Sequence, residues 1–138
     1  MEKTFSIPIE IRFRDLDAMG HVNNAVYFTY FEEARKAFIL KLFEIKEPSD
    51  YFFILADISC TFLKPIQLGD KVNVTISVGE IRNKSFTFKY KIVHQENPAI
   101  IFAEGSSTQV YYDYKEKRSK TIPENIKEIL LSHVSEKI

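Results

Sequence analysis

The sequence predicts an α+β domain in which an antiparallel β-sheet wraps around one long central helix. Three observations predict it: strand-like alternation near the start, a long apolar helical segment at residues 25–43, and four further alternating segments with short connections. Short connections favour antiparallel neighbours. No repeat, linker or low-complexity segment divides the chain, so residues 1–138 are predicted to form a single domain.

The first strand is predicted from a regular alternation of apolar and polar residues over residues 5–13. Pro8 lacks an N–H group, so one side of this strand is expected to be unpaired near its start. The polar segment that follows contains Gly20, Asn23 and Asn24, which are typical of turns and helix caps. The strand is therefore expected to end there and a helix to begin.

The central helix is predicted from Ala25 to about Phe43. One face carries apolar residues at helical spacing, but further apolar residues surround the rest of the helix. A helix that is apolar nearly all round is expected to be buried on more than one side. The residues of the first face are Tyr27, Tyr30, Phe31, Ala34 and Phe38, and those around it are Val26, Phe28, Ile39 and Leu40.

Alternation returns after residue 50 and predicts four strands. The last strand is predicted from Ala99 to Tyr112, with Gly105 as a bulge, and an amphipathic helix from Pro123 to about Ser135. A sheet of this size can cover the helix, but the backbone groups of its edge strands remain unpaired. A second copy of the chain can pair with such an edge, so a homodimer or homotetramer is expected. The apolar faces predicted for the first three strands are Ile54, Ala56, Ile58, Cys60 and Phe62; Val72, Val74, Ile76 and Val78; and Phe86, Phe88, Tyr90 and Ile92.

The composition argues against several classes of function. Nineteen Lys and Arg balance nineteen Asp and Glu, so neither nucleic acid nor a membrane surface is predicted as a partner. Apolar runs such as residues 99–103 are far shorter than the roughly 20 residues of a membrane helix. The first residues lack the apolar core of a signal peptide, so a cytoplasmic location is expected. Cys60 is the only cysteine, which excludes an intrachain disulfide and a Cys-based metal site; no metal or cofactor is expected.

The chemistry is expected in residues 14–27, which read Arg-Asp-Leu-Asp-Ala-Met-Gly-His-Val-Asn-Asn-Ala-Val-Tyr. This segment places acids, a histidine and amides in the turn that opens the central helix. A helix N-terminus presents unpaired N–H groups and roughly half a positive charge, which stabilise an oxyanion on an attacked carbonyl. Asp17 lies a few residues upstream, where its carboxylate can act on water or on the carbonyl. The segment therefore predicts a hydrolytic site.

The same residues resemble the 4-hydroxybenzoyl-CoA thioesterase-like branch of the hotdog superfamily. The pattern is Asp-x-Asp-x-x-Gly-His-Val-Asn-Asn-x-x-Tyr, followed by Tyr-Phe-Glu-x-Ala-Arg at residues 30–35. The likeness covers nearly the whole chain, and the order of its pieces is more specific than any one of them. The later pieces are Phe-Leu-Lys-Pro at residues 62–65, Gly69-Asp70, Lys84-Ser85-Phe86, and residues 118–123.

The resemblance implies a hotdog fold and an acyl-CoA thioesterase with Asp17 as its catalytic carboxylate. It also implies that the thioester carbonyl is held by the backbone N–H of Asn24 or a close neighbour, in a site that lies between subunits. Asn23 and Tyr27 are expected to contact substrate. Short-chain members of the family often carry a histidine at the position of Asn24, whereas this chain has His21 earlier in the turn. The role of His21, catalytic or structural, is therefore left open.

Other charged residues near the motif are expected to be structural. Asp15 is expected to pair with Arg12 or Arg14. Glu32 and Glu33 are expected to make salt links within the helix surface or between subunits.

CoA requires basic groups for its phosphates. Arg82, Lys84 and Ser85 match a family segment that contacts the nucleotide end, and Arg118-Ser119-Lys120 forms a second basic cluster. An ordinary solvated charge run is the alternative for both. Acyl-CoA is the expected substrate; thioesters of acyl carrier protein present the same reacting group and are the alternative.

Two other functions are compatible with the same fold. One is hydration or dehydration of acyl-CoA, but the Gly-Asp-x-Asn-Pro-x-His type of segment that such enzymes usually carry is absent from the sequence. The other is an acyl-CoA-binding module without turnover. The Asp17 motif argues against it, since a binding module has no need of a carboxylate beside the carbonyl.

Overall fold

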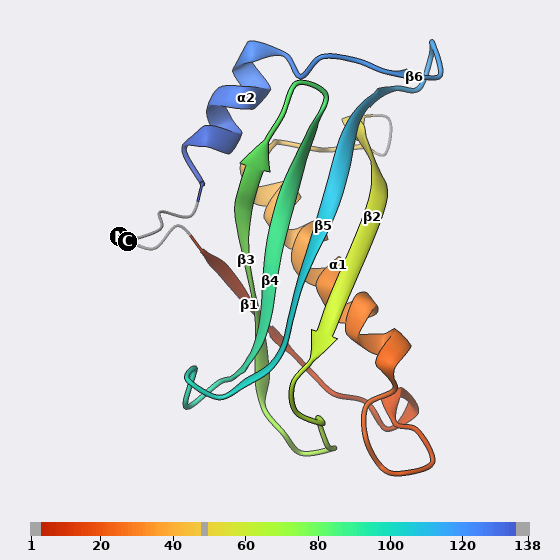
Figure 1. The fold of residues 1–138 in the computed structure, drawn as a ribbon, viewed down its shortest axis with the longest axis vertical. Coiled ribbons are helices and arrows are strands. Elements are labelled where there is room, and N and C mark those ends of the chain that lie inside the picture. The colour runs from red at the N-terminus through yellow and green to blue at the C-terminus, as the bar shows by residue number, and fades with distance from the viewer. Residues whose placement is uncertain (1–3, 48–49, 135–138) are drawn as a thin grey trace.

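The computed structural model describes residues 4–47 and 50–134 and has the predicted α+β architecture. Helix α1 lies across one face of an antiparallel sheet (Figure 1). In chain order the elements are β1 (Phe5–Ile9), the 3₁₀ helix η1 (Phe13–Asp15), α1 (Asn24–Leu42), β2 (Phe53–Phe62), β3 (Val72–Ile81), β4 (Ser85–His94), β5 (Ile101–Asp113), β6 (Arg118–Ser119) and α2 (Glu124–Leu131).

The main strands of the sheet have the order β1-β3-β4-β5-β2, and every neighbouring pair is antiparallel. The two-residue strand β6 pairs with the end of β5. Strands β1 and β2 are therefore the two edges. The prediction for Pro8 is confirmed, because this residue lies in the edge strand β1, whose other side has no ladder partner among the described residues.

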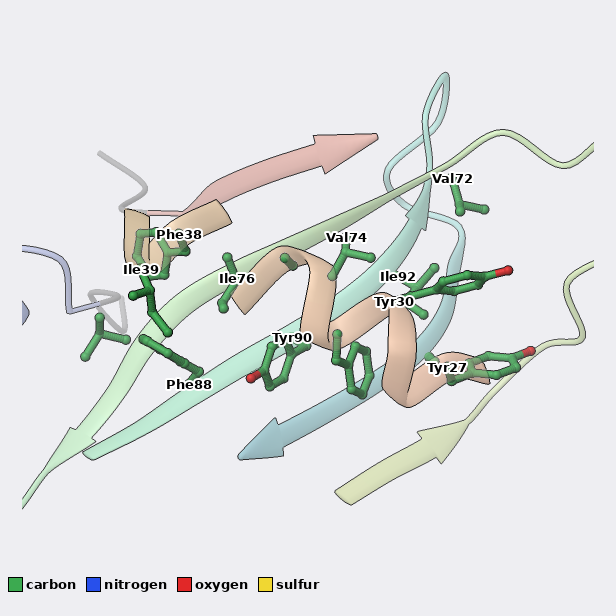
Figure 2. Close-up of a cluster of buried hydrophobic side chains, with 14 of the residues drawn as sticks. Tyr27, Tyr30, Phe38, Ile39, Val72, Val74, Ile76, Phe88, Tyr90 and Ile92 are labelled. Atoms are coloured by element: carbon green, nitrogen blue, oxygen red, sulfur yellow. The ribbon is translucent and has the colours of Figure 1, made fainter. Parts of the chain in front are cut away.

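Helix α1 begins one residue before the predicted start because Asn23 is its N-cap. Its sheet-facing side interleaves with the inward side chains of β3 and β4, such as Val74, Ile76 and Phe88 (Figure 2). Leu40 is 57% exposed, so within one chain the helix is covered on its sheet-facing side only. The residues buried on α1 are Tyr27, Tyr30, Phe31, Ala34, Arg35, Phe38 and Ile39.

A chain of polar side chains crosses the core between α1 and the sheet. Arg35 donates to the hydroxyl of Tyr90 at 3.1 Å, and that hydroxyl lies 2.5 Å from the hydroxyl of Ser107. Ser107 donates to the side chain of Gln109, which in turn donates to the backbone oxygen of Phe86 at 3.2 Å. Each buried polar group is therefore hydrogen-bonded, as burial in an apolar core requires.

Strand β2 differs from the predicted alternation because its pairing with β5 shifts by one residue between Leu55 and Asp57. Leu55 pairs with Gln109 and Ile58 pairs with Ser107, two buried residues of β5 that face α1. Leu55 and Ile58 therefore share the inner face. The prediction that Ile54 and Ala56 share a face with Ile58, Cys60 and Phe62 is wrong, because a one-residue bulge reverses the alternation.

Gly105 is not a bulge, contrary to the prediction. It pairs regularly with Cys60 on one side and Tyr90 on the other. A Cβ at this position would lie 2.5 Å from the ring of Phe31 and from the backbone oxygen of Ser59. The glycine therefore allows α1 to approach the sheet closely.

Helix α2 starts after Pro123, which is its N-cap rather than its first residue, and ends at Leu131. Residue 135, the predicted end, lies outside the described residues. Leu130 is fully buried, and the ring of His133 packs edge-on against Phe38 at 6.0 Å. The helix therefore closes the core beside the C-terminal half of α1.

Candidate active site

The loop between η1 and α1 is held in place by the buried side chain of Asp15. Its carboxylate accepts hydrogen bonds from the backbone N–H of Arg12 at 3.0 Å, from the Arg12 guanidinium at 3.1 Å and from the Tyr30 hydroxyl at 2.8 Å. Burial alone would raise the pKa of Asp15, but these hydrogen bonds and the Arg12 charge together hold it below its ordinary value. The expected structural role of Asp15 is confirmed, with Arg12 as the partner.

Asp17 lies in a tight turn that fixes one of its carboxylate oxygens. Oδ1 accepts from the backbone N–H groups of Met19 at 2.9 Å and His21 at 3.1 Å. The Asp17 N–H donates to the backbone oxygen of His21 at 2.7 Å, and Gly20 supports the turn with a φ of 78°. Oδ2 takes part in no hydrogen bond described for residues 4–47 and 50–134. One oxygen therefore orients the carboxylate, and the other is available for chemistry.

The first turn of α1 contains one backbone N–H group that the helix does not use. The Asn23 side chain accepts from the Ala25 N–H at 2.9 Å, and the Asn23 backbone oxygen accepts from Val26 at 2.9 Å. The N–H of Asn24 has no acceptor within the part of the chain that the structure describes. This N–H lies at the positive end of a 19-residue helix, where an anionic oxygen is stabilised.

Asp17 and Asn24 line the same pocket, which has a volume of about 240 Å³. His21 and Tyr27 line it as well. Tyr27 is 2% exposed and packs edge-on against the ring of Phe62 at 4.8 Å. Burial raises the pKa of the Tyr27 hydroxyl above its ordinary value, which already keeps this donor group protonated at neutral pH. The remaining lining residues are Val22, Leu63, Lys64 and Pro65.

His21 is half-buried and is tied to the loop after β2. It forms a bridge with Gln67, and the neighbouring Val22 N–H donates to Ile66 at 2.8 Å. Its backbone serves the Asp17 turn, and its ring makes no hydrogen bond in the described residues. The structure therefore gives His21 a structural part in the turn and a place in the pocket wall.

Not every residue predicted for the site comes together in one chain. Asn23 caps α1 and is not among the residues that line the pocket. Ser85 pairs with Val110, whereas Phe62 at the pocket pairs with Ala103. Seven residues of one strand separate the two levels, which is roughly 23 Å.

Arg82 and Lys84 precede Ser85 in the β3–β4 hairpin, so they share its distance from the Asp17 loop (Figure 1). Arg82 forms an ion pair with Glu80 at 3.0 Å. Lys84 lines a separate shallow hollow with Arg118 and Lys120. The two basic clusters named from the sequence are therefore neighbours, at the end of the sheet opposite the pocket.

The wall formed by residues 62–65 was not assigned a role from the sequence. Phe62 is the last residue of β2, and residues 63–65 follow it in a loop, where the backbone N–H groups of Leu63 and Lys64 both donate to the backbone oxygen of Phe102. Alternation placed Phe62 on one face of a strand and gave no reason to place these residues at a site. Their place in the family resemblance was the one signal that pointed to them.

Two general features accompany the site. In residues 4–47 and 50–134, no three His, Cys, Asp or Glu side chains lie close enough together to hold a metal ion. No helix in the same residues is long and apolar enough to span a membrane.

Residues 11–130 match the model of a family described as the thioesterase-like superfamily. The chain belongs to this superfamily. The helix-end site and the elements from η1 to β6 lie within the matched residues, and the hotdog fold expected from the resemblance is confirmed. Two relatives and one solved structure that this thioesterase-like chain resembles each share about a quarter of their aligned residues with it.

One relative is YsmA of Bacillus subtilis (strain 168), which is 26% identical over 87 residues, or 63% of this chain and 59% of YsmA. Another is the long-chain acyl-CoA thioesterase FadM of Escherichia coli (strain K12), 26% identical over 131 residues, with 88% of this chain and 93% of FadM covered. A solved thioesterase of Thermus thermophilus, complexed with coenzyme A and Zn, is 27% identical with a TM-score of 0.81, covering 95% of this chain and 94% of that one.

Proposed function

We propose that this thioesterase-like chain hydrolyses acyl thioesters of CoA or of acyl carrier protein, releasing the acid and the thiol. The observation that carries the proposal is the pairing, in one pocket, of an oriented carboxylate at Asp17 with an unused N–H at Asn24. The named activities of relatives such as FadM support the substrate class.

The Asn24 N–H would hold the thioester oxygen, and the helix-end charge would stabilise the tetrahedral intermediate. The free Oδ2 of Asp17 would take a proton from an attacking water, or attack the carbonyl carbon itself to give an acyl-aspartyl anhydride. In either route the thiolate leaves with the electron pair of the C–S bond and is then protonated. In the anhydride route a water molecule then hydrolyses the anhydride, which releases the free acid and restores the Asp17 carboxylate. A single-turnover reaction in ¹⁸O water separates the routes, because only the anhydride route places the label in the Asp17 carboxylate.

The proposal includes a homodimer joined through the free edge of β2. This strand carries exposed apolar side chains, including Leu55 at 44% and Phe62 at 43%. An unpaired apolar edge strand is a template for another strand, and a second copy of the chain is the partner always present. Antiparallel pairing of two β2 strands would bring the basic clusters of one protomer toward the pocket of the other, which gives CoA phosphates a partner.

The replacement of Asp17 by Asn tests the function. Asp17→Asn keeps an oxygen that accepts from Met19 and His21, so the fold is expected to persist, while the group loses its basicity. Release of free thiol from a panel of acyl-CoA esters is expected to fall by at least about a hundredfold.

Asp70→Asn is the matched control, since Asp70 lies in the adjacent loop, where it accepts from the Gln67 N–H at 2.8 Å, and is not a pocket residue. Its activity is expected to stay near that of the unmodified chain. Full thiol release by Asp17→Asn would refute the assignment. A change in enoyl absorbance without thiol release would favour hydration, and binding without either change would favour a module without turnover.

A further inference from the structure

The Asp17 turn lies at the tip of a short antiparallel ribbon, residues 15–23, that leads into α1. Three backbone contacts join the two sides of this ribbon: the Asn23 N–H donates to the Asp15 backbone oxygen at 2.8 Å, Leu16 bridges Val22, and the Asp17 N–H donates to the His21 backbone oxygen at 2.7 Å. Two strands of this length are not stable alone. The position of the ribbon therefore depends on its contacts with the rest of the chain.

The ribbon reaches the loop after β2 through the bridge between His21 and Gln67. Its contacts with α1 are few. Beyond the first turn of the helix, a single hydrogen bond joins the ribbon to α1 in the part of the chain that the structure describes: the Tyr30 hydroxyl donates to Asp15 Oδ2 at 2.8 Å. This hydrogen bond, the Asp15–Tyr30 link, spans 15 residues of the chain. The link therefore fixes the ribbon to the body of the helix.

Both partners of the Asp15–Tyr30 link are buried and oriented. Tyr30 is 3% exposed, and Figure 2 shows its hydroxyl directed toward the N-terminal end of α1. Asp15 is 2% exposed, and the two hydrogen bonds that it accepts from Arg12 come from three residues away, within the same short segment. Burial first, and then the hydrogen bond to Asp15, raise the pKa of Tyr30 above its ordinary value. The hydroxyl therefore remains the donor, and the carboxylate the acceptor, of a charge-assisted hydrogen bond.

The ribbon carries both groups that the hydrolysis would use. The Asp17 carboxylate lies near its tip, and the Asn24 N–H lies where the ribbon becomes α1. Asp17 is two residues beyond Asp15, which is roughly 7 Å along an extended chain. A rotation of the ribbon by about 10° about Asp15 would therefore move Asp17 by about 1 Å relative to the helix. A displacement of about 1 Å can lower turnover about a hundredfold, so the reaction depends on this angle.

We propose that Asp15 is a positioning residue of the hydrolytic site. Its hydrogen bond to Tyr30 fixes the ribbon on α1 and so keeps the Asp17 carboxylate and the Asn24 N–H at the separation that the reaction needs. This inference rests on the proposed thioester hydrolysis. Asp15 and Tyr30 are not among the residues that line the pocket, so they act through the groups that do. Their effect is expected in the chemical step and not in substrate binding.

Tyr30→Phe tests the positioning role because it removes the link and keeps the ring. With hexanoyl-CoA as the probe, kcat is expected to fall about tenfold or more while KM stays within about twofold. Tyr90→Phe is the matched control, since it also removes a buried hydroxyl, which accepts from Arg35 at 3.1 Å and lies outside the pocket. It is expected to lose stability in urea and to keep kcat within about twofold. An equal fall of kcat in both variants would reduce the link to a contribution to stability and would overturn the proposal.

Substitutions of Asp15 test the link from its other end. The serine of Asp15→Ser is too short to reach the Tyr30 hydroxyl, so kcat is expected to fall as in Tyr30→Phe, and this variant serves if Tyr30→Phe does not fold. The double variant is expected to lose no more kcat than either single variant, because the same hydrogen bond is absent from all three. Asp15→Asn keeps an oxygen that can accept from Tyr30 and is expected to retain kcat within about threefold. Losses that multiply in the double variant, or an equal loss in Asp15→Asn, would contradict the positioning role.

Hydrogen exchange of the ribbon gives a measurement that does not depend on activity. The backbone N–H groups of Asp17 and Asn23 close the ribbon, and both are expected to exchange about tenfold faster or more in Tyr30→Phe and Asp15→Ser than in the unmodified chain. In Tyr90→Phe their exchange is expected to be unchanged. Unchanged exchange in both link variants, or an equal rise in Tyr90→Phe, overturns the inference. A lack of thiol release by the unmodified chain overturns the proposed function itself, and with it the catalytic part of the positioning role.

Discussion

The replacement of Asn24 by proline isolates the backbone donor of the site. Asn24 is the first residue of α1, where proline is tolerated because the N–H is unused by the helix and φ is already suitable. The preceding residue must be extended, and Asn23 has φ −60° and ψ 138°. The substitution therefore removes one N–H group and leaves the cap from Asn23 to Ala25 in place.

The expected loss follows from the role of that N–H. Removing one preorganised oxyanion donor raises the barrier by about 2.7–4 kcal/mol, or about 10²–10³ in turnover. The loss should fall on kcat, because the interaction strengthens as charge develops on the oxygen. The free energy of unfolding is expected to change by less than about 1 kcal/mol, because no hydrogen bond of the described residues is lost.

The measurement is thiol release with saturating acyl-CoA, together with a urea unfolding curve for each variant. Asn24→Ala is the matched control, since it removes an exposed side chain and keeps the N–H. Its kcat is expected to remain within a few-fold of the unmodified chain. A proline variant that folds normally and keeps more than about a tenth of the turnover would refute the oxyanion role. Equal losses in both variants would move that role to the Asn24 side chain.

Two further predictions concern the scaffold. Tyr30→Phe removes a hydrogen bond to a charged acceptor and is expected to cost about 1.5–3 kcal/mol of unfolding free energy, measured in urea. The pKa of Asp15 is lowered in the folded state, so its contribution to the free energy of unfolding is present above the unfolded pKa of 3.8 and is lost as the pH falls below that value. This loss of stability in acid should be smaller in Tyr30→Phe. Equal dependence of stability on acid pH in the two proteins would contradict this. Gly105→Ala is expected to cost about 3 kcal/mol of unfolding free energy, measured in urea, since its Cβ would meet the Phe31 ring and a backbone oxygen at 2.5 Å.

The sequence was sufficient for features that depend on local pattern. The start of α1 was within one residue of its place because Asn23 is a capping residue followed by helical periodicity. Asp17 and Asn24 were placed at one pocket because both flank the same turn and helix end. Such features need no knowledge of distant strands.

Features that depend on pairing were beyond the sequence. A period of two residues cannot reveal an extra residue, so the bulge at Ala56 reversed the predicted face of Ile54. Gly105 was taken for a bulge because the approach of Phe31 from α1 is a contact between distant segments. The separation of Lys84 from Asp17 follows from the order of strand ends, which only the sheet topology shows.

The bulge in β2 also bears on how the chain avoids aggregation. An exposed apolar edge can pair with strands of other proteins. A regular strand that paired with β2 would align its inward-facing side chains with those of β2 on one side of Ala56 only. Beyond that residue it would turn apolar side chains to water and polar ones to the core, and the mismatch would limit its growth to a few residues. The single additional residue Ala56 therefore limits which strands can pair with this edge. It makes amyloid-like stacking less favourable without placing a charge or a proline among the apolar side chains.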